Sequence, residues 1–110
     1  LELRNGGTVR VYSDGSQRWF MNDKLHRTDG PASAWAGGDQ YWYQDGMRHR
    51  TDGPAALLAD GSQFWYQNNV LHRTDGPAEI RADGTQRWYL NDQALPQADH
   101  ARQVQKLKAK

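Results

Sequence analysis

A heptapeptide whose side chains could support catalysis occurs three times in this sequence. His-Arg-Thr-Asp-Gly-Pro-Ala occupies residues 26–32, 49–55 and 72–78. In each copy the threonine hydroxyl, the imidazole and the carboxylate offer a nucleophile, a base and an orienting group. An active site is normally present once, so a threefold copy indicates a structural role. We expect His and Arg to hydrogen-bond backbone or the aspartate of an adjacent unit, and Asp to close its own turn.

The same spacing argues against a shared metal ion or a carboxylate pair. Zinc-binding nitrogen atoms lie about 2.0–2.1 Å from the ion, whereas equivalent residues of neighbouring β-hairpins, two strands apart, are separated by about 10 Å. His26, His49 and His72 therefore cannot share an ion, and Asp29 and Asp52 cannot form an acid–base pair. We predict no catalytic residues, no metal site, no cofactor and no enzymatic activity.

The heptapeptide belongs to a longer unit that repeats every 23 residues. A tryptophan recurs at this step, with a glutamine two residues before it and a Phe or Tyr directly after it. We call these tryptophans the Trp ladder: Trp19, Trp42, Trp65 and Trp88. Repetition at a fixed period is typical of an array of identical supersecondary units.

Each unit has the pattern of a β-hairpin. Residues 8–13 and 16–22 are rich in β-branched and aromatic side chains, and Asp14-Gly15 lies between them as a turn. A second turn is expected at Asn22-Asp23, since both residue types accept left-handed backbone. The sequence predicts an all-β fold, a single-layer antiparallel β-hairpin repeat over residues 1–95, followed by a capping segment over residues 96–110.

A helix from about residue 98 to residue 108 is predicted in that segment. Gly and β-forming residues are absent there, and apolar residues recur every three positions as one helical stripe: Ala98, Ala101, Val104 and Leu107. We expect this helix to cover the end of the row of hairpins.

The register of the hairpins follows from the length of the turn. A two-residue turn at Asp14-Gly15 would place Val9 opposite Phe20. Small and branched residues would then share the buried face with the Phe and Tyr residues: Val9, Val11, Ala32, Ala34, Ala55, Leu57, Ala78 and Ile80 with Phe20, Tyr43, Tyr66 and Tyr89. The Trp ladder would lie on the other face, beside Arg10, Ser33, Ala56 and Glu79.

Composition excludes several classes of protein. The 110 residues include no cysteine and carry a net charge of +1, which excludes disulfides and thiolate zinc sites and gives no overall electrostatic signal for nucleic acid. No apolar run is long enough to span a membrane, so membrane binding is not expected. These features favour the cytoplasm, of a bacterium or of a phage-infected cell.

Two sets of residues are candidates for contacts with a partner. Aromatic residues that break the repeat are the first, because a core position should recur whereas a contact position is free to vary: Tyr12, Trp35, Tyr41 and Phe64. The Trp ladder is the second, because Trp dominates binding hot spots. Arg18 and Arg87, with Arg10 and Arg81, are expected near the ladder.

The repeat resembles a known family. The Asp-Gly turn, the Trp-Tyr pair and the 23-residue period over about residues 6–95 are similar to MORN repeats, and His-Arg-Thr-Asp-Gly-Pro-Ala to a MORN-like variant in bacterial, phage and large-virus proteins. In place of the usual His-Gly-x-Gly element of MORN repeats this chain has that heptapeptide. The resemblance implies an elongated single sheet used for protein or lipid contacts, and relatives include antitoxin components.

These observations predict a non-enzymatic module that binds a protein, as an inhibitor, antitoxin or phage-encoded antagonist would. A homodimer through the open ends of the sheet is also expected. One alternative is single-stranded nucleic acid bound by the aromatic and Arg side chains. Another is a structural repeat within a larger protein, since the chain begins at Leu1 rather than Met.

Overall fold

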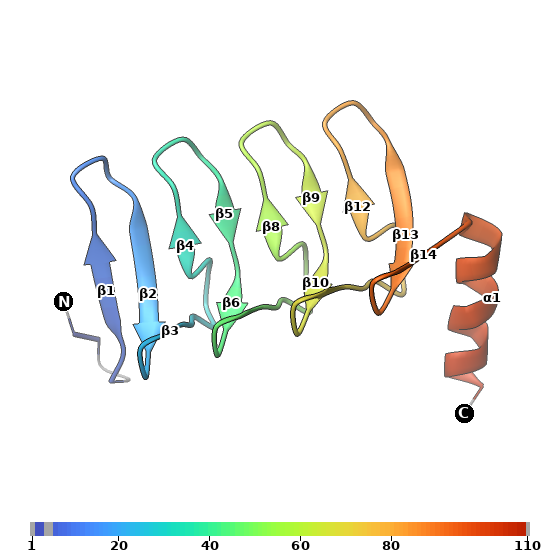
Figure 1. Cartoon of the computed structure of the whole chain (residues 1–110), viewed down its shortest axis with the longest axis horizontal. Helices are drawn as coiled ribbons and strands as arrows, with labels where there is room; N and C mark the ends of the chain where they lie inside the picture. Colours follow the sequence, from blue (N-terminus) through green and yellow to red (C-terminus); the bar gives the residue numbers. More distant parts are fainter. Residues whose placement is uncertain (1, 4–5, 110) are drawn as a thin grey trace.

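The structure is a computed structural model that describes residues 2–3 and 6–109. Four β-hairpins stand side by side in one row, and a single helix lies at the end of the row (Figure 1). The predicted all-β hairpin repeat with a C-terminal helix is confirmed. The predicted ranges 1–95 and 96–110 include residues 1, 4–5 and 110, which lie outside the described residues.

Each unit contributes one hairpin and one or two short strands after it. The first unit contains β1 (Thr8–Val11), β2 (Gln17–Met21) and β3 (Lys24–Leu25). The second contains β4 (Ser33–Ala34), β5 (Gln40–Tyr41), β6 (Tyr43–Gln44) and β7 (Met47–Arg48). The third contains β8 (Ala56–Leu57), β9 (Gln63–Phe64), β10 (Tyr66–Gln67) and β11 (Val70–Leu71). The fourth contains β12 (Glu79–Ile80), β13 (Gln86–Leu90) and β14 (Gln93–Leu95), and α1 (Gln97–Lys108) follows.

The sheet runs through all four units as one antiparallel layer. Its order is β1-β2-β4-β5-β8-β9-β12-β13-β14, so the return strand of each hairpin pairs with the first strand of the next. The molecule measures 47 × 34 × 17 Å, which is thin along one axis. No large side chain in the described part of the chain is fully buried, and Ala32, Ala55 and Ala78 are the residues with no exposed surface.

The predicted register is wrong by one residue, because the hairpin loop has three residues rather than two. The Tyr12 N–H donates to the Ser16 carbonyl over 2.8 Å, which closes a loop of Ser13, Asp14 and Gly15. Gly15 has φ +93°, as the last position of a three-residue loop with a bulge requires. Val9 therefore pairs with Trp19 instead of Phe20. The third unit shows the same shift, since Ala56 rather than Leu57 pairs with Phe64.

A one-residue shift exchanges the faces that were predicted. Residues directly opposite each other on antiparallel strands point to the same side, so Val9 lies on the side of the Trp ladder rather than on that of Phe20. Ala34 and Leu57 pair with glutamines of the repeat and also lie on the ladder side. Four residues were predicted beside the ladder but lie on the opposite side, because each pairs with the residue directly before a ladder tryptophan. These pairs are Arg10 with Arg18, Ser33 with Tyr41, Ala56 with Phe64 and Glu79 with Arg87.

The second turn of each unit agrees with the sequence. Asn22 and Asp23 have φ of 52° and 62°, and Asn68 and Asn69 have φ of 50° and 71°. Two consecutive left-handed residues form a two-residue turn that suits the twist of the flanking strands. In the first unit this turn brings β3 back along β2, with Met21 opposite Lys24.

The helix α1 packs at the end of the row through His100 and Val104, so only one residue of its predicted apolar stripe is buried. Val104 is buried as expected, whereas Leu107 is 52% exposed and both stripe alanines are exposed. The other buried residue is His100, whose Nε2 lies 2.6 Å from the Arg73 carbonyl oxygen. A hydrogen bond to the third unit therefore fixes the helix. Among the described residues, no helix is long and apolar enough to cross a membrane.

Candidate binding face

The repeated heptapeptide forms a bulge that covers the Trp ladder. In the second copy the Arg50 guanidinium lies 4.0 Å from the Trp42 ring centroid. Its Nε donates to Asp52 over 2.9 Å, and its NH1 donates to the Pro54 carbonyl over 3.1 Å. The other two copies have the same contacts, with Arg27 over Trp19 and Arg73 over Trp65.

The glycine of the heptapeptide provides the space for this arginine. A Cβ on Gly53 would lie 2.8 Å from Arg50 Cζ, closer than real Cβ contacts allow. The guanidinium is therefore held between the Gly53 backbone and the Trp42 ring. The Asp52 carboxyl is hydrogen-bonded to Arg50 and close to its charge, and this contact lowers the pKa of Asp52.

The histidine of the heptapeptide joins each unit to the next. His26 Nδ1 accepts a hydrogen bond from the Asp45 N–H over 3.0 Å, and His49 and His72 accept equivalent bonds from Asn68 and Asn91. The prediction that His and Arg bond to backbone is confirmed. The arginine pairs with the aspartate of its own heptapeptide and not with that of an adjacent unit, so this aspartate holds the arginine in place of the expected turn closure. The heptapeptide occurs three times because the same contacts, the Arg on the Trp and the His bond to the next unit, are made at each junction between neighbouring units.

Among the candidate residues, the Trp ladder is used in these internal contacts. Trp19, Trp42 and Trp65 are half-buried beneath an arginine. Trp88 has no such arginine, because Leu95-Pro96 replaces His-Arg in the last unit, and it lines a hollow with these two residues. The predicted arginines are not beside the ladder, since Arg18 and Arg87 lie on the opposite face.

A lysine at position 50 is expected to destabilise the protein. Lysine keeps the charge but cannot stack as a plane on Trp42 while donating to Asp52 and Pro54. Since Asp52 is 85% exposed, most of the loss should come from the ring and the carbonyl. We expect Arg50→Lys to lower the free energy of unfolding by about 1–2 kcal/mol in urea denaturation.

The matched control is Arg10→Lys, at an exposed position on the opposite face. It should change the free energy of unfolding by less than about 0.5 kcal/mol. Equal losses for the two variants would contradict the structural role of Arg50.

The aromatic side chains that break the repeat lie together on the face opposite the ladder. This face has three varying positions in each hairpin: one on the first strand, one directly after that strand and one on the return strand. We call this surface the variable face: Arg10, Tyr12, Arg18, Ser33, Trp35, Tyr41, Ala56, Leu58, Phe64, Glu79, Arg81 and Arg87. All six non-ladder candidates from the sequence are on it.

Four of those candidates meet between the first two hairpins. The Arg18 guanidinium lies 4.6 Å from the Trp35 ring centroid and 5.3 Å from that of Tyr12. Arg18, Trp35 and Tyr41 line an open hollow of about 510 Å³ together with Tyr43. Trp35 is 45% exposed and is among the few large apolar side chains that are. Burial raises the pKa of Tyr41, which therefore stays neutral in this hollow.

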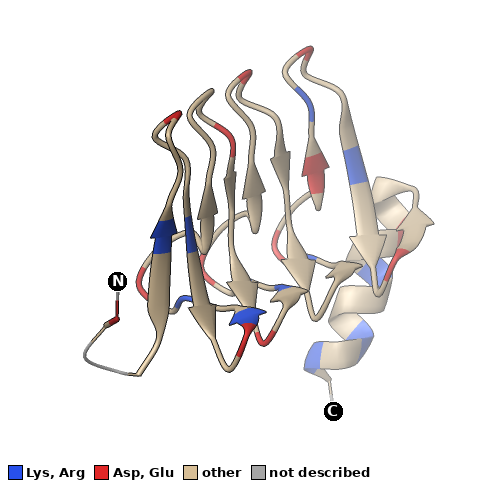
Figure 2. Ribbon diagram, turned by 60° about the vertical axis from the view of Figure 1, so that its left-hand side comes forward, with Lys and Arg blue, Asp and Glu red and all other residues tan. Residues whose placement is uncertain are grey.

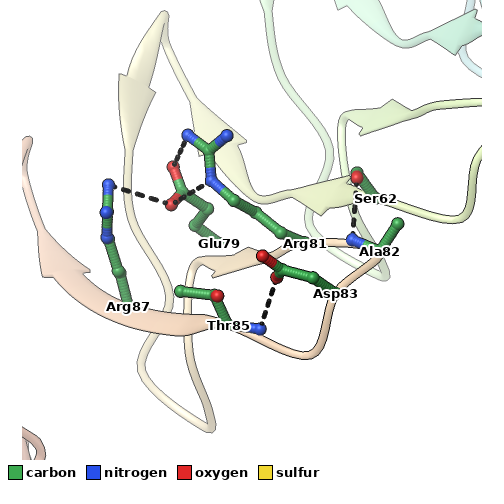
Figure 3. A network of polar contacts seen from close by, with 7 residues as sticks. All are labelled: Ser62, Glu79, Arg81, Ala82, Asp83, Thr85 and Arg87. Carbon is green, nitrogen blue, oxygen red and sulfur yellow. Dashed lines mark hydrogen bonds and ion pairs between the residues drawn. The ribbon is translucent and has the colours of Figure 1, made fainter.

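A charged network occupies the variable face of the fourth unit (Figure 3). Glu79 is 4% exposed, and its Oε2 lies 3.0 Å from Arg81 Nε and 3.4 Å from Arg87 NH1. The hydrogen bond and the charge of Glu79 raise the pKa of Arg81. Two half-exposed guanidinium groups thus share one buried carboxylate.

Two rings of the third unit lie beneath arginines of the neighbouring units. Arg81 lies 5.9 Å from the Phe64 ring centroid, and Arg48 lies 4.2 Å from that of Tyr66. Sequence reasoning missed Arg48 and the role of Glu79. Both break the repeat, since Leu25 and Leu71 are the equivalents of Arg48. A search of every repeat-breaking position, and not only the aromatic ones, finds them.

Stability is expected to fall in acid because of His72. Burial, with a smaller effect of nearby His100, lowers the pKa of His72 below its ordinary value of 6.5. The unfolded chain then binds a proton at a higher pH than the folded chain. The contribution of neutral His72 is complete above about pH 6.5 and is lost as pH falls through the lower folded pKa.

The test compares wild type with His72→Gln by urea denaturation between about pH 7.5 and pH 5. Protonated Nδ1 could not accept the Asn91 N–H, 3.1 Å away, so the wild type should lose more stability than the variant over this range. If the free energy of unfolding of the two proteins changed with pH in parallel, burial of His72 would not be the cause of the acid destabilisation.

No group of three or more His, Asp or Glu side chains within residues 2–3 and 6–109 is placed to hold a metal ion. Comparison of the chain with protein-family models, curated proteins and solved structures finds no match. The resemblance to MORN repeats therefore stays a prediction, and the proposal of function depends on the variable face itself.

Proposed function

We propose that this protein is a non-enzymatic module that binds another protein through the variable face. One observation carries the proposal: the tryptophans and heptapeptides that recur every 23 residues make internal contacts, whereas the aromatic residues that break the repeat gather on one face. Internal contacts must recur in every unit, but recognition of a partner needs a particular set of side chains. Trp, Tyr and Arg, which dominate binding hot spots, make up much of this set.

The test is affinity capture from a lysate of the source cells, with nuclease treatment in parallel and identification by mass spectrometry. We expect one protein at near-equal stoichiometry, retained after nuclease and reduced when Trp35→Ala is the bait. Trp42→Phe, on the opposite face, is the matched control and should capture as wild type does. Equal capture by Trp35→Ala would contradict binding through the variable face, and capture of no protein would favour a structural repeat.

Single-stranded nucleic acid is a second candidate ligand, favoured by arginines that alternate with rings. Arg18 between Tyr12 and Trp35 is one such arrangement, and guanidinium groups beside rings can bind phosphates while bases stack. Capture that disappears with nuclease would favour this alternative. Inhibition of the partner, as an antitoxin acts, is the biological form of binding that the MORN-like resemblance suggests.

A further inference from the structure

We propose that the partner presents an extended acidic segment that crosses the strands of the variable face, with its carboxylates held by Arg18 at one end and by Arg81 and Arg87 at the other. This inference rests on the proposed function, because it names the chemistry of the partner for the same face. It follows from the distribution of charge, the state of the arginines and the length of the row.

Charge is distributed unevenly over a chain whose net charge is only +1. The aspartates of the repeat are in turns and bulges, at the tips of the hairpins and at their opposite end (Figure 2). At the tips, Asp14, Asp60 and Asp83 accept hydrogen bonds from the residues two positions on.

The variable face carries mostly positive charge. Five arginines are on it or border it: Arg10, Arg18, Arg48, Arg81 and Arg87. Glu79 pairs with Arg81 and Arg87. Asp39, which lines the hollow beside Arg18, accepts the Ala59 N–H over 2.8 Å and keeps its negative charge, so the positive charge of the face is in excess but not unopposed. A partner that complements this face is therefore acidic, and such complementarity gives both specificity and rapid association.

The guanidinium groups of these arginines are held in place by internal contacts and still have N–H donors without a partner in those contacts. Arg18 lies over two rings, which limits its rotamers before any partner arrives. Arg81 uses its Nε and NH2 on Glu79, and a guanidinium has five N–H donors. Arg81 and Arg87 are 49% and 54% exposed. Since two cations share one buried carboxylate, a second carboxylate from the partner would balance the remaining charge.

The distance between the two ends sets the length of the segment. Arg18 on β2 and Arg87 on β13 are six strand steps apart in the sheet order. At about 4.8 Å per step the span is about 29 Å, which an extended peptide covers with about nine residues. A compact small anion would contact only one of the two clusters.

The same contacts favour an acidic peptide over a nucleic acid. Single-stranded nucleic acids need open ring faces on which bases stack. Arginines already lie over three rings of this face, Tyr12, Trp35 and Phe64. They also lie over two recurring rings beside it, Phe20 and Tyr66. A carboxylate can pair with the guanidinium edge while the arginine stays on its ring. A phosphate can do the same, so the covered rings, and not the arginines, are what disfavour a nucleic acid.

The test uses fluorescence anisotropy with three labelled probes. The first is a peptide of about twelve residues in which Glu alternates with Leu and Tyr, the second has Gln in place of every Glu, and the third is oligodeoxythymidine of equal length. We expect the acidic peptide to bind at least about tenfold more tightly than either other probe. Its affinity should fall as salt rises.

Variants assign the binding to the two clusters. Two variants should each lower the affinity for the acidic peptide by about fivefold or more. The first is Arg18→Gln, and the second is the double variant Arg81→Gln with Arg87→Gln. Lys106→Gln with Lys108→Gln, in the last turn of α1, removes equal charge away from the face and should leave affinity unchanged. Equal binding of the acidic and amide peptides, or tighter binding of the oligonucleotide, would overturn the inference.

Failure of this inference is distinguishable from failure of the proposed function. A captured protein that is lost with Trp35→Ala but retained with both arginine variants would leave the binding function intact and reject the acidic segment. A protein captured equally by Trp35→Ala and by wild type would reject both.

Discussion

Replacement of Trp42 by alanine is expected to lower the free energy of unfolding by about 3 kcal/mol. Loss of a buried Trp usually costs about 3–5 kcal/mol, and this ring is only half-buried, so the lower end applies. The change also removes the ring on which the Arg50 guanidinium lies at 4.0 Å. The bulge formed by the second heptapeptide would then lose its main contact with the sheet.

The matched control for this prediction is Trp35→Ala. Trp35 is 45% exposed on the variable face, so its loss should cost less than about 1 kcal/mol. Urea denaturation followed by far-UV circular dichroism measures both variants against wild type. If both variants lowered the free energy of unfolding by a comparable amount, the ladder face would not be the structural face and the variable face would not be free for binding.

The second large effect is expected on binding rather than on stability. Trp35→Ala and Arg18→Ala should each lower the affinity for the partner isolated by affinity capture at least about tenfold, which corresponds to about 1.4 kcal/mol. Both side chains line the hollow between the first two hairpins, and their cation–π contact at 4.6 Å makes them one unit. The double variant should therefore lose less than the sum of the single losses.

Calorimetric titration of the isolated partner provides the measurement for this second prediction. Trp42→Phe is the control, because phenylalanine keeps a ring beneath Arg50 and leaves the variable face unchanged. Affinities of Trp35→Ala and Arg18→Ala within a factor of about two of wild type would place the contact surface elsewhere.

The repeat could be read from the sequence because its cause is local and recurs. The 23-residue step of the Trp ladder, the Asn-Asp turn at 22–23 and the glycines of the hairpin loops each reflect a backbone requirement that only a few residue types satisfy. The row of hairpins and the absence of a layer above it followed from these signals.

The register could not be read in the same way. Asp14-Gly15 suits a two-residue turn, and it equally suits the end of a three-residue loop with Gly15 in the left-handed region. The hydrogen bond from Tyr12 N–H to Ser16 selects the longer loop. Because side chains alternate along a strand, this single residue exchanged the two faces of the whole sheet.

The candidate site could be found despite this error. Tyr12, Trp35, Tyr41 and Phe64 vary where a core residue would recur, and this variation is visible from the 23-residue period whatever the register. Which arginines accompany them depends on pairing across strands, so Arg18 was assigned to the wrong neighbours. The helix was affected similarly, because the buried side chain that fixes it is a histidine and not a member of the apolar stripe.

The division between a structural face and a binding face is tested most directly by the indole N–H signals of the five tryptophans in a 15N-labelled sample. The captured partner would be titrated into the protein, with each signal assigned by a Trp→Phe variant. We predict that the Trp35 signal shifts or broadens first, while those of Trp19, Trp42 and Trp65 stay in place beneath their arginines. Perturbation of those three signals with Trp35 unchanged would contradict the account and move the binding site to the opposite face.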